Sequence, residues 1–107
     1  MANIYKNELI DLTTTDNTVI YTTPSDSRAI IKSILVSEDA GSGCDITFTI
    51  TNAASAVFSL FKTKAVSANG TVELLSAPLV VEESEILKVT AATANRLHVV
   101  ASFLEIG

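Results

Sequence analysis

The sequence predicts an all-β domain, a sandwich or a barrel of about eight short antiparallel strands with negligible helix. Runs rich in Ile, Val, Thr, Phe and Tyr recur at a spacing of roughly ten residues, and turn-forming residues separate them. No stretch shows sustained helical periodicity, and the best helical candidate, residues 63–69, is too short to weigh. Residues 1–107 are expected to form a single domain, since typical domains have about 100–150 residues.

The strands can be placed from these runs and from the turns between them. The expected strands are residues 4–12, 18–23, 28–38, 44–51, 57–62, 71–75, 86–91 and 96–106. The turn signals are Asp16-Asn17, Pro24-Ser25-Asp26, Gly41-Ser42-Gly43, Asn52, Asn69-Gly70, Pro78 and Asn95. Asn-Gly between two strand-like runs is the strongest short-range hairpin signal, so a hairpin is expected around Asn69-Gly70.

Side-chain alternation predicts which faces are buried. Strand 44–51 alternates apolar and polar residues, which indicates one buried and one solvated face. Strands 28–38 and 96–106 do not alternate in this way. The first is expected to place Ile30, Ile34 and Val36 on one face and Ile31 and Leu35 on the other; the second places Leu97, Val99 and Phe103 opposite Val100, Leu104 and Ile106.

Strands that are apolar on both faces need a cover on each face. No helix is predicted that could supply the second cover, so another subunit is the expected one. We therefore predict a homotrimer or homodimer in which the subunit interface contains Ile30, Ile34, Val100, Leu104 and Ile106. The composition agrees with an assembled protein that buries apolar surface between subunits, because 48% of the residues are hydrophobic, only 18% are charged and the mean hydropathy is +0.41.

Charge excludes several classes of partner. The formal net charge is −5 with only seven Lys and Arg residues, which are scattered, so neither nucleic acid nor an anionic membrane surface is an expected partner. The single cysteine, Cys44, allows no internal disulfide and fits folding in a reducing cytosol. The first residues do not have the pattern of a secretory signal peptide.

Each residue that could carry chemistry also has a simpler structural interpretation. His98, the only histidine, lies among apolar strand residues and is expected to be structural or interfacial. Cys44 begins an inward-facing row and is expected to be an inert core residue. The acidic run Glu82, Glu83 and Glu85 matches no calcium loop, although a weak cation site between subunits stays open. We expect no catalytic residue, no metal and no cofactor.

Two stretches together resemble a known group of proteins. The first covers residues 10–24 and 29–36; the second covers residues 78–82, 86–91 and 96–106 and ends in Ser102-Phe103-Leu104-Glu105-Ile106. This pattern resembles the small all-β virion structural proteins of tailed bacteriophages, which often end in such a strand. Those proteins commonly carry a Gly-Asp turn where this chain has Glu83-Ser84-Glu85.

The resemblance implies a jelly-roll-like antiparallel β-sandwich and a non-enzymatic role in the virion, assembled in the bacterial host cytoplasm. It implies a capsid decoration (cement) protein that binds the major capsid protein, or alternatively a tail, neck or fibre-attachment subunit. A glycan-binding module is the alternative from another class. Such a module would need Tyr5, Tyr21, Phe58 and Phe61 to cluster at one end of the domain.

Overall fold

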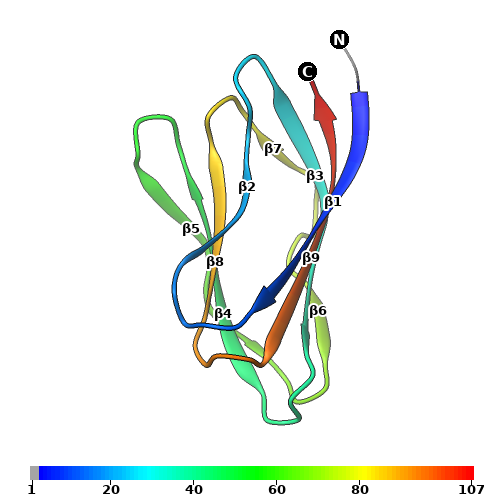
Figure 1. Ribbon diagram of the computed structural model, residues 1–107, viewed down its shortest axis with the longest axis vertical. Coiled ribbons are helices and arrows are strands. Elements are labelled where there is room, and N and C mark those ends of the chain that lie inside the picture. Colours follow the sequence, from blue (N-terminus) through cyan, green and yellow to red (C-terminus); the bar gives the residue numbers. More distant parts are fainter. Residues whose placement is uncertain (1–2) are drawn as a thin grey trace.

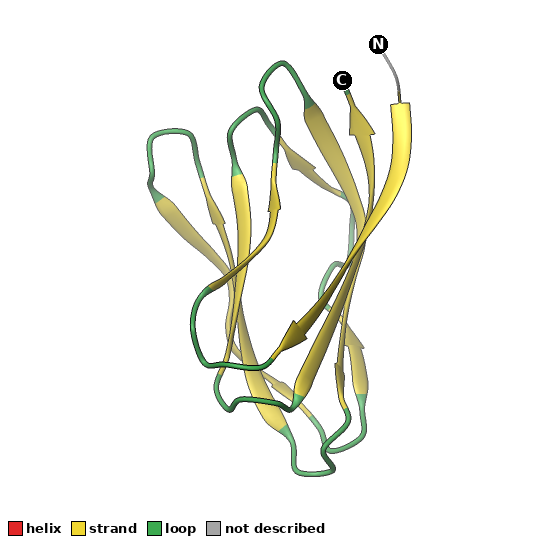
Figure 2. Cartoon of the chain, viewed as in Figure 1, coloured by secondary structure: helices red, strands yellow, loops and turns green. Residues whose placement is uncertain are grey.

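The computed structural model describes residues 3–107, which contain nine strands, turns and bends but no helix (Figures 1 and 2). The strands are β1 (Asn3–Leu12), β2 (Thr18–Thr22), β3 (Arg28–Glu38), β4 (Cys44–Thr51), β5 (Val57–Val66), β6 (Thr71–Glu73), β7 (Leu79–Val81), β8 (Ile86–Ala91) and β9 (Leu97–Ile106). The all-β prediction is confirmed. The described residues offer no helix that could cross a membrane.

The strands form two antiparallel sheets that pack face to face. The β9 sheet has the order β1-β9-β3-β6, with β7 also paired to β3, and the β8 sheet has the order β2-β8-β4-β5. Figure 1 shows these as two layers, with the β8 sheet on the left and the β9 sheet on the right. This strand order is that of a jelly roll, in which most connections cross from one sheet to the other. The fold is therefore a sandwich, and the expectation of a jelly-roll-like sandwich is confirmed.

Two segments differ from the expected strands. β5 continues to Val66, so residues 63–69 are strand and turn and the helical candidate is wrong. The strand beside β3 is divided: β6 pairs with β3 at Leu35, and β7 pairs with it at Ile31. Pro78 lies in the break, where its missing N–H costs no ladder hydrogen bond. The expected strands include β6 but not β7.

The Asn69-Gly70 turn is present but does not make a hairpin. Gly70 N–H donates to Ser67 O at 2.9 Å, and Asn69 has φ +56°, which asparagine tolerates better than most residues. However, β5 pairs with β4 in the β8 sheet, whereas β6 pairs with β3 in the β9 sheet. The turn therefore crosses between the sheets, and the hairpin prediction is wrong.

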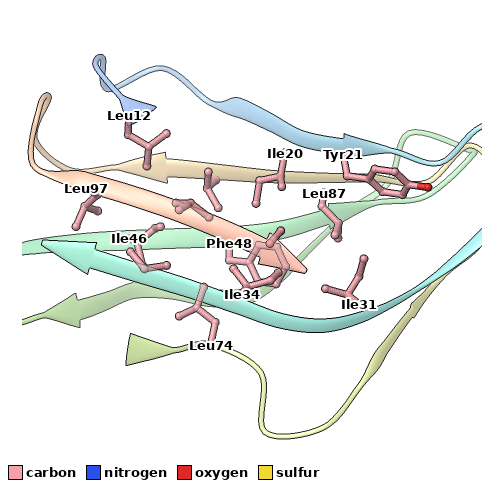
Figure 3. Close-up of a cluster of buried hydrophobic side chains, with 14 of the residues drawn as sticks. Leu12, Ile20, Tyr21, Ile31, Ile34, Ile46, Phe48, Leu74, Leu87 and Leu97 are labelled. Atoms are coloured by element: carbon pink, nitrogen blue, oxygen red, sulfur yellow. The ribbon is translucent and has the colours of Figure 1, made fainter. Parts of the chain in front are cut away.

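The core lies between the sheets and is filled by alternate residues of both. Figure 3 shows Ile34 from the β9 sheet beside Phe48 from the β8 sheet, with Ile46 and Leu87 nearby. Phe48 and Phe103 are the largest fully buried side chains of residues 3–107. Burying an aliphatic or aromatic side chain of this size stabilises the fold by about 1.5–3 kcal/mol.

A β-bulge in β3 corrects the predicted faces of that strand. The pairing of β3 with β9 shifts between Ile31 and Ser33, so Lys32 is an extra residue with no partner in β9. As a result Ile31 and Ile34 both point into the core, and each is fully buried. Ile34 is therefore unavailable to a second subunit, and its assignment to the interface is wrong. The predicted faces of β9 are correct: Leu97, Val99 and Phe103 are buried.

Two carboxylates hold connections of the sandwich together. Glu38 is only 2% exposed and accepts N–H groups from Ala40, Gly41, Ser42 and Asn69. The hydrogen bond from Asn69 and the three from the other N–H groups lower the pKa of Glu38, although burial acts in the opposite direction. This carboxylate therefore joins the β3–β4 loop to the β5–β6 turn.

The second carboxylate, Glu105, joins the two sheets. Tyr21 on β2 donates its hydroxyl to Glu105 on β9 at 2.6 Å, and Lys6 Nζ lies 3.0 Å from the other carboxylate oxygen. Burial and the neighbouring Glu105 raise the pKa of Tyr21, while the hydrogen bonds from Tyr21 and Lys6 lower that of Glu105. The Tyr21 ring also lies against Phe103, with ring centroids 4.5 Å apart.

Candidate assembly surface

The outer face of the β9 sheet is apolar where a solvated sheet would be polar. In β9, residues 98, 100, 102, 104 and 106 alternate with the buried set and point outward. The neighbouring strands bring apolar residues beside the outward Val100 and Leu104. No strand or loop of residues 3–107 pairs across this face, so its apolar side chains have no cover of the kind that the core side has.

The apolar side chains form two rows that run across the strands. The Leu104 row contains Tyr5, Leu104, Ile30 and Val80, and the Val100 row contains Leu9, Val100 and Leu35. Directly opposite residues in antiparallel strands have Cβ atoms about 4.5–5.5 Å apart, so each row is continuous. Tyr5, Leu9 and Val80 are more than half exposed.

The rows gather most of the residues predicted for the interface. Ile30, Val100 and Leu104 share the outer face, and Ile106 lies on it at the end of β9. Sequence reasoning missed Tyr5 and Leu9, which account for the most exposed part of the rows. Their spacing of four in strand 4–12 places them on one face and was the available signal. That these residues contact another subunit stays a prediction.

A polar row separates the two apolar rows. It contains Asn7, Ser102 and Ser33, and the surface is hollowed beside it, between Tyr5 and Lys32. Glu73 on β6 is opposite Leu35, and its side chain reaches the end of the polar row. It accepts the Ser33 hydroxyl, Ile34 N–H at 2.7 Å and Leu75 N–H at 3.2 Å. Burial acts to raise the pKa of Glu73, but these three hydrogen bonds together lower it. Glu73 thus satisfies Ile34 N–H beside the β3 bulge and Leu75 N–H in the loop after β6.

His98 lies on the same face between two carboxylates. Its Nε2 is 3.3 Å from Asp11 Oδ1, and its Nδ1 is 3.4 Å from Asp39 Oδ2. The carboxylates lie on opposite sides of the ring, so they do not converge on one point as metal ligands do. Within the part of the chain that the structure describes, no group of three His, Cys, Asp or Glu side chains could hold a metal ion. The arrangement supports the interfacial or structural reading of His98.

The remaining candidates are accounted for by local contacts. Cys44 is 9% exposed and faces the core, as predicted. In the acidic run, Glu83 accepts Asp26 N–H and Glu85 accepts Glu82 N–H at 2.7 Å. These carboxylates therefore satisfy turn amides.

The aromatic residues do not form the cluster that a glycan-binding module would need. Tyr21 is buried and Phe61 is half-buried. Tyr5 lies on β1 of the β9 sheet, whereas Phe58 lies on β5 of the β8 sheet. The four side chains required by this alternative therefore do not form one exposed cluster.

No protein-family model and no curated protein matches the chain in sequence. Solved structures match it in fold. A chain of the Bacillus endospore appendages, described as disulfide-linked pili, gives a TM-score of 0.56 at 15% identity, covering 96% of this chain and 86% of that one. A chain from the acid-stable capsid of Helicobacter pylori bacteriophage KHP30 gives a TM-score of 0.55 at 6% identity, covering 100% and 94%. At these identities the likeness establishes a shared fold.

Proposed function

We propose that this chain is a non-enzymatic structural subunit of a phage virion, a capsid decoration (cement) protein that binds the major capsid protein and stabilises the shell. The observation that carries the proposal is the pair of exposed apolar rows on the β9 sheet. Contiguous exposed apolar surface on a small domain is typical of an interaction site. The fold shared with a phage capsid chain and the terminal strand Leu97–Ile106 support the same role.

A cement subunit needs a rigid scaffold and complementary patches. The jelly roll supplies the scaffold, and the Leu104 and Val100 rows supply a patch. Contacts that are weak singly become strong when many copies bind a lattice, because each further contact is made at high effective concentration. This role needs no cofactor, and the net charge of −5 favours protein partners over nucleic acid or membrane.

A tail, neck or fibre-attachment subunit is the second candidate. The observation that favours it is the shared fold with a chain of the Bacillus endospore appendages, which are described as pili and are therefore extended assemblies. In that arrangement the same apolar rows would contact the next subunit along the tail or fibre.

Localisation in purified virions tests both candidates. The experiment compares particles made with and without the protein by mass spectrometry, cryo-electron microscopy and heat challenge. Decoration predicts many copies on the shell and earlier genome release from particles that lack the protein. Density confined to the tail would replace the first candidate by the second, and absence from virions would overturn both.

The apolar rows can be tested on the same particles. Leu104→Asp places a carboxylate where contact with the capsid would strip its water, so re-binding to depleted particles should be lost. Val57→Asp is the matched control, because Val57 is 62% exposed on β5 of the other sheet. Equal binding of both variants would show that the rows are not the capsid contact.

A further inference from the structure

β1 lies at the border of the β9 sheet, and its outer edge pairs with no strand in residues 3–107 (Figure 1). It is ten residues long, so a row of backbone N–H and C=O groups faces outward along it. Tyr5 and Leu9 on this strand are the most exposed large apolar side chains of the described chain, at 76% and 69%. A long, apolar, unpaired edge is a template for another strand.

We propose that two copies of this chain pair through their β1 strands, antiparallel and centred on Asn7, to make one continuous sheet. A symmetric antiparallel pair is centred on one residue that faces its own copy, and residues equally distant from it then lie opposite one another. Centring on Asn7 makes β1 self-complementary. It sets Lys6 opposite Glu8 of the second copy, Tyr5 opposite Leu9, and Ile4 opposite Ile10.

The neighbouring symmetric registers are disfavoured. Centring on Lys6 sets two lysines opposite each other, and centring on Glu8 sets two glutamates opposite each other. Like charges directly opposite destabilise a strand pair, whereas opposite charges and apolar pairs stabilise it. A register centred between two residues would require outward and inward side chains to share a face. Only the Asn7-centred register pairs every charge of the strand's middle with its opposite.

The same register covers the exposed apolar residues of β1. Tyr5 and Leu9 would cover each other on the outer face, and Ile4, which is 46% exposed, would gain Ile10 on the inner face. The Val100 row of one copy ends at Leu9 and the Leu104 row of the other begins at Tyr5. The two rows therefore join across the boundary into bands that run over both copies.

The charges on β1 specify the partner. Lys6 and Glu8 are on the inward face of the strand, and inward-pointing charges on an edge normally prevent pairing. Lys6 is bonded to Glu105, but no cationic nitrogen of residues 3–107 lies within salt-bridge distance of Glu8. A second copy in the Asn7-centred register supplies Lys6 to Glu8, so the charges that repel other strands attract this one.

Charge reversal with mixing tests the pairing. Lys6→Glu alone sets two carboxylates opposite each other, and Glu8→Lys alone sets two ammonium groups opposite each other. Each variant should therefore be monomeric, with a dissociation constant raised by roughly tenfold or more. Mixing the two variants restores opposite charges at both positions, and a heterodimer should form. Sedimentation velocity measures the states, with Lys62→Glu on β5 as a control that should dimerise like the wild-type chain.

Mixing also distinguishes loss of the dimer contact from damage to the fold of the single chain. The Lys6→Glu chain still lacks its bond to Glu105 in the mixture, so rescue by Glu8→Lys cannot come from repair of that bond. A wild-type chain that stays monomeric at millimolar concentration, or a mixture that stays monomeric where the wild-type chain dimerises, would overturn the proposal.

A cross-link tests the register. Directly opposite Cα atoms in an antiparallel pair lie about 4.5–5.5 Å apart, within the range of a disulfide. Asn7→Cys should therefore form a disulfide-linked dimer on mild oxidation. Asn3→Cys should not, because Asn3 lies opposite Asp11 of the second copy; equal cross-linking of both would exclude the Asn7-centred register. The biological purpose of the dimer rests on the proposed assembly role, but these solution tests can fail or succeed whether or not the protein is found in virions.

Discussion

Tyr21 and Glu105 show how single residues hold the sandwich together. The hydroxyl of Tyr21 reaches from the β8 sheet to a carboxylate of the β9 sheet at 2.6 Å. Glu105 is also bonded to Lys6 of β1, so three strands meet at one carboxylate. This contact lies at the end of the sandwich where β1 begins and β9 ends. It joins the two sheets at an end of the sandwich where Ile4 and Lys6 of β1 are exposed.

Tyr21→Phe should lower the free energy of unfolding by about 1.5–3 kcal/mol, the usual contribution of a hydrogen bond to a charged group. The ring contact with Phe103 is kept, so the change isolates the hydroxyl. Urea denaturation measures it, and Tyr5→Phe is the control because Tyr5 is exposed and its hydroxyl makes no hydrogen bond within residues 3–107. A loss equal in both variants would show that the bond to Glu105 contributes nothing.

Glu38 should make stability depend on pH. Its pKa is lower in the folded chain than in the unfolded chain, because four N–H groups donate to the ionised form. As the pH is lowered, the unfolded chain therefore binds more protons than the folded chain does. The free energy of unfolding decreases as the pH falls. The contribution of Glu38 is complete above the ordinary glutamate pKa and is lost as pH falls through the lowered folded-state pKa.

Glu38→Gln should lower the midpoint of thermal unfolding at neutral pH and weaken its decline in acid. The amide group presents an N–H₂ to amides that need acceptors, so hydrogen bonds to the loop are lost. Glu73 and Glu105, whose pKa values are also lowered, would keep part of the decline. Glu82→Gln, at an exposed position, is the control. An unchanged pH profile in Glu38→Gln would contradict the assignment.

Cys44 offers a test of the core itself. It is nearly buried at the start of the inward row of β4, so Cys44→Ala should cost on the order of 1 kcal/mol. The native thiol should react with a thiol reagent much more slowly than the unfolded chain does. Equal rates would mean that the start of β4 opens readily.

At the scale of the element, the bulge in β3 decides which residues are inside. Lys32 is the extra residue: Ile31 pairs with Phe103 and Ser33 with Ser102, so deleting Lys32 leaves the inward set unchanged. The deletion should therefore retain cooperative unfolding. Deletion of Leu35 in the same strand should not, because it turns Val36 and Glu38 toward solvent. Thermal unfolding followed by circular dichroism compares them; a cooperative Leu35 deletion would show that β3 can slip its register.

The bulge also marks a feature of β3 that regular alternation in the sequence does not predict. Alternation in β9 is regular, so its inward and outward residues followed from the sequence alone. In β3 the adjacent polar residues Lys32 and Ser33 interrupt an apolar run, and this doublet was the only sign that the phase changes. Regular alternation through this doublet places Ile34 on the wrong face. The Asn69-Gly70 turn was recognised from local chemistry, but which sheet each flanking strand joins depends on distant partners.

For the whole molecule, the β1 edge and the outer apolar rows meet at Tyr5 and Leu9 but have separate consequences. Pairing through β1 uses the free backbone N–H and C=O groups of that edge and covers Tyr5 and Leu9. It leaves Leu104 and Ile30 on the open face of the enlarged sheet. A dimer therefore presents two copies of the remaining apolar patch on one continuous sheet. Two linked patches bind a lattice more tightly than one, because the second contact is made within the same complex.

This separation predicts two different defects on particles. In this arrangement Leu104 belongs to the capsid contact, in place of the contact between copies expected from the sequence. Leu104→Asp should therefore still dimerise, because Leu104 is one strand away from the β1 edge, but should not bind particles that lack the protein. Lys6→Glu should be monomeric and bind the same particles more weakly than the wild-type chain, by roughly tenfold or more if both patches of a dimer engage.

The mixture of Lys6→Glu with Glu8→Lys provides the deciding comparison. It should recover wild-type binding, since the heterodimer carries both apolar patches intact. Binding is measured by co-sedimentation with the particles over a range of protein concentrations. If Lys6→Glu binds as tightly as the wild-type chain, the particle contact is made by single chains and the dimer has no part in it. If Leu104→Asp binds normally, the contact lies on another face of the sandwich, and the exposed residues of β5 become the next surface to test.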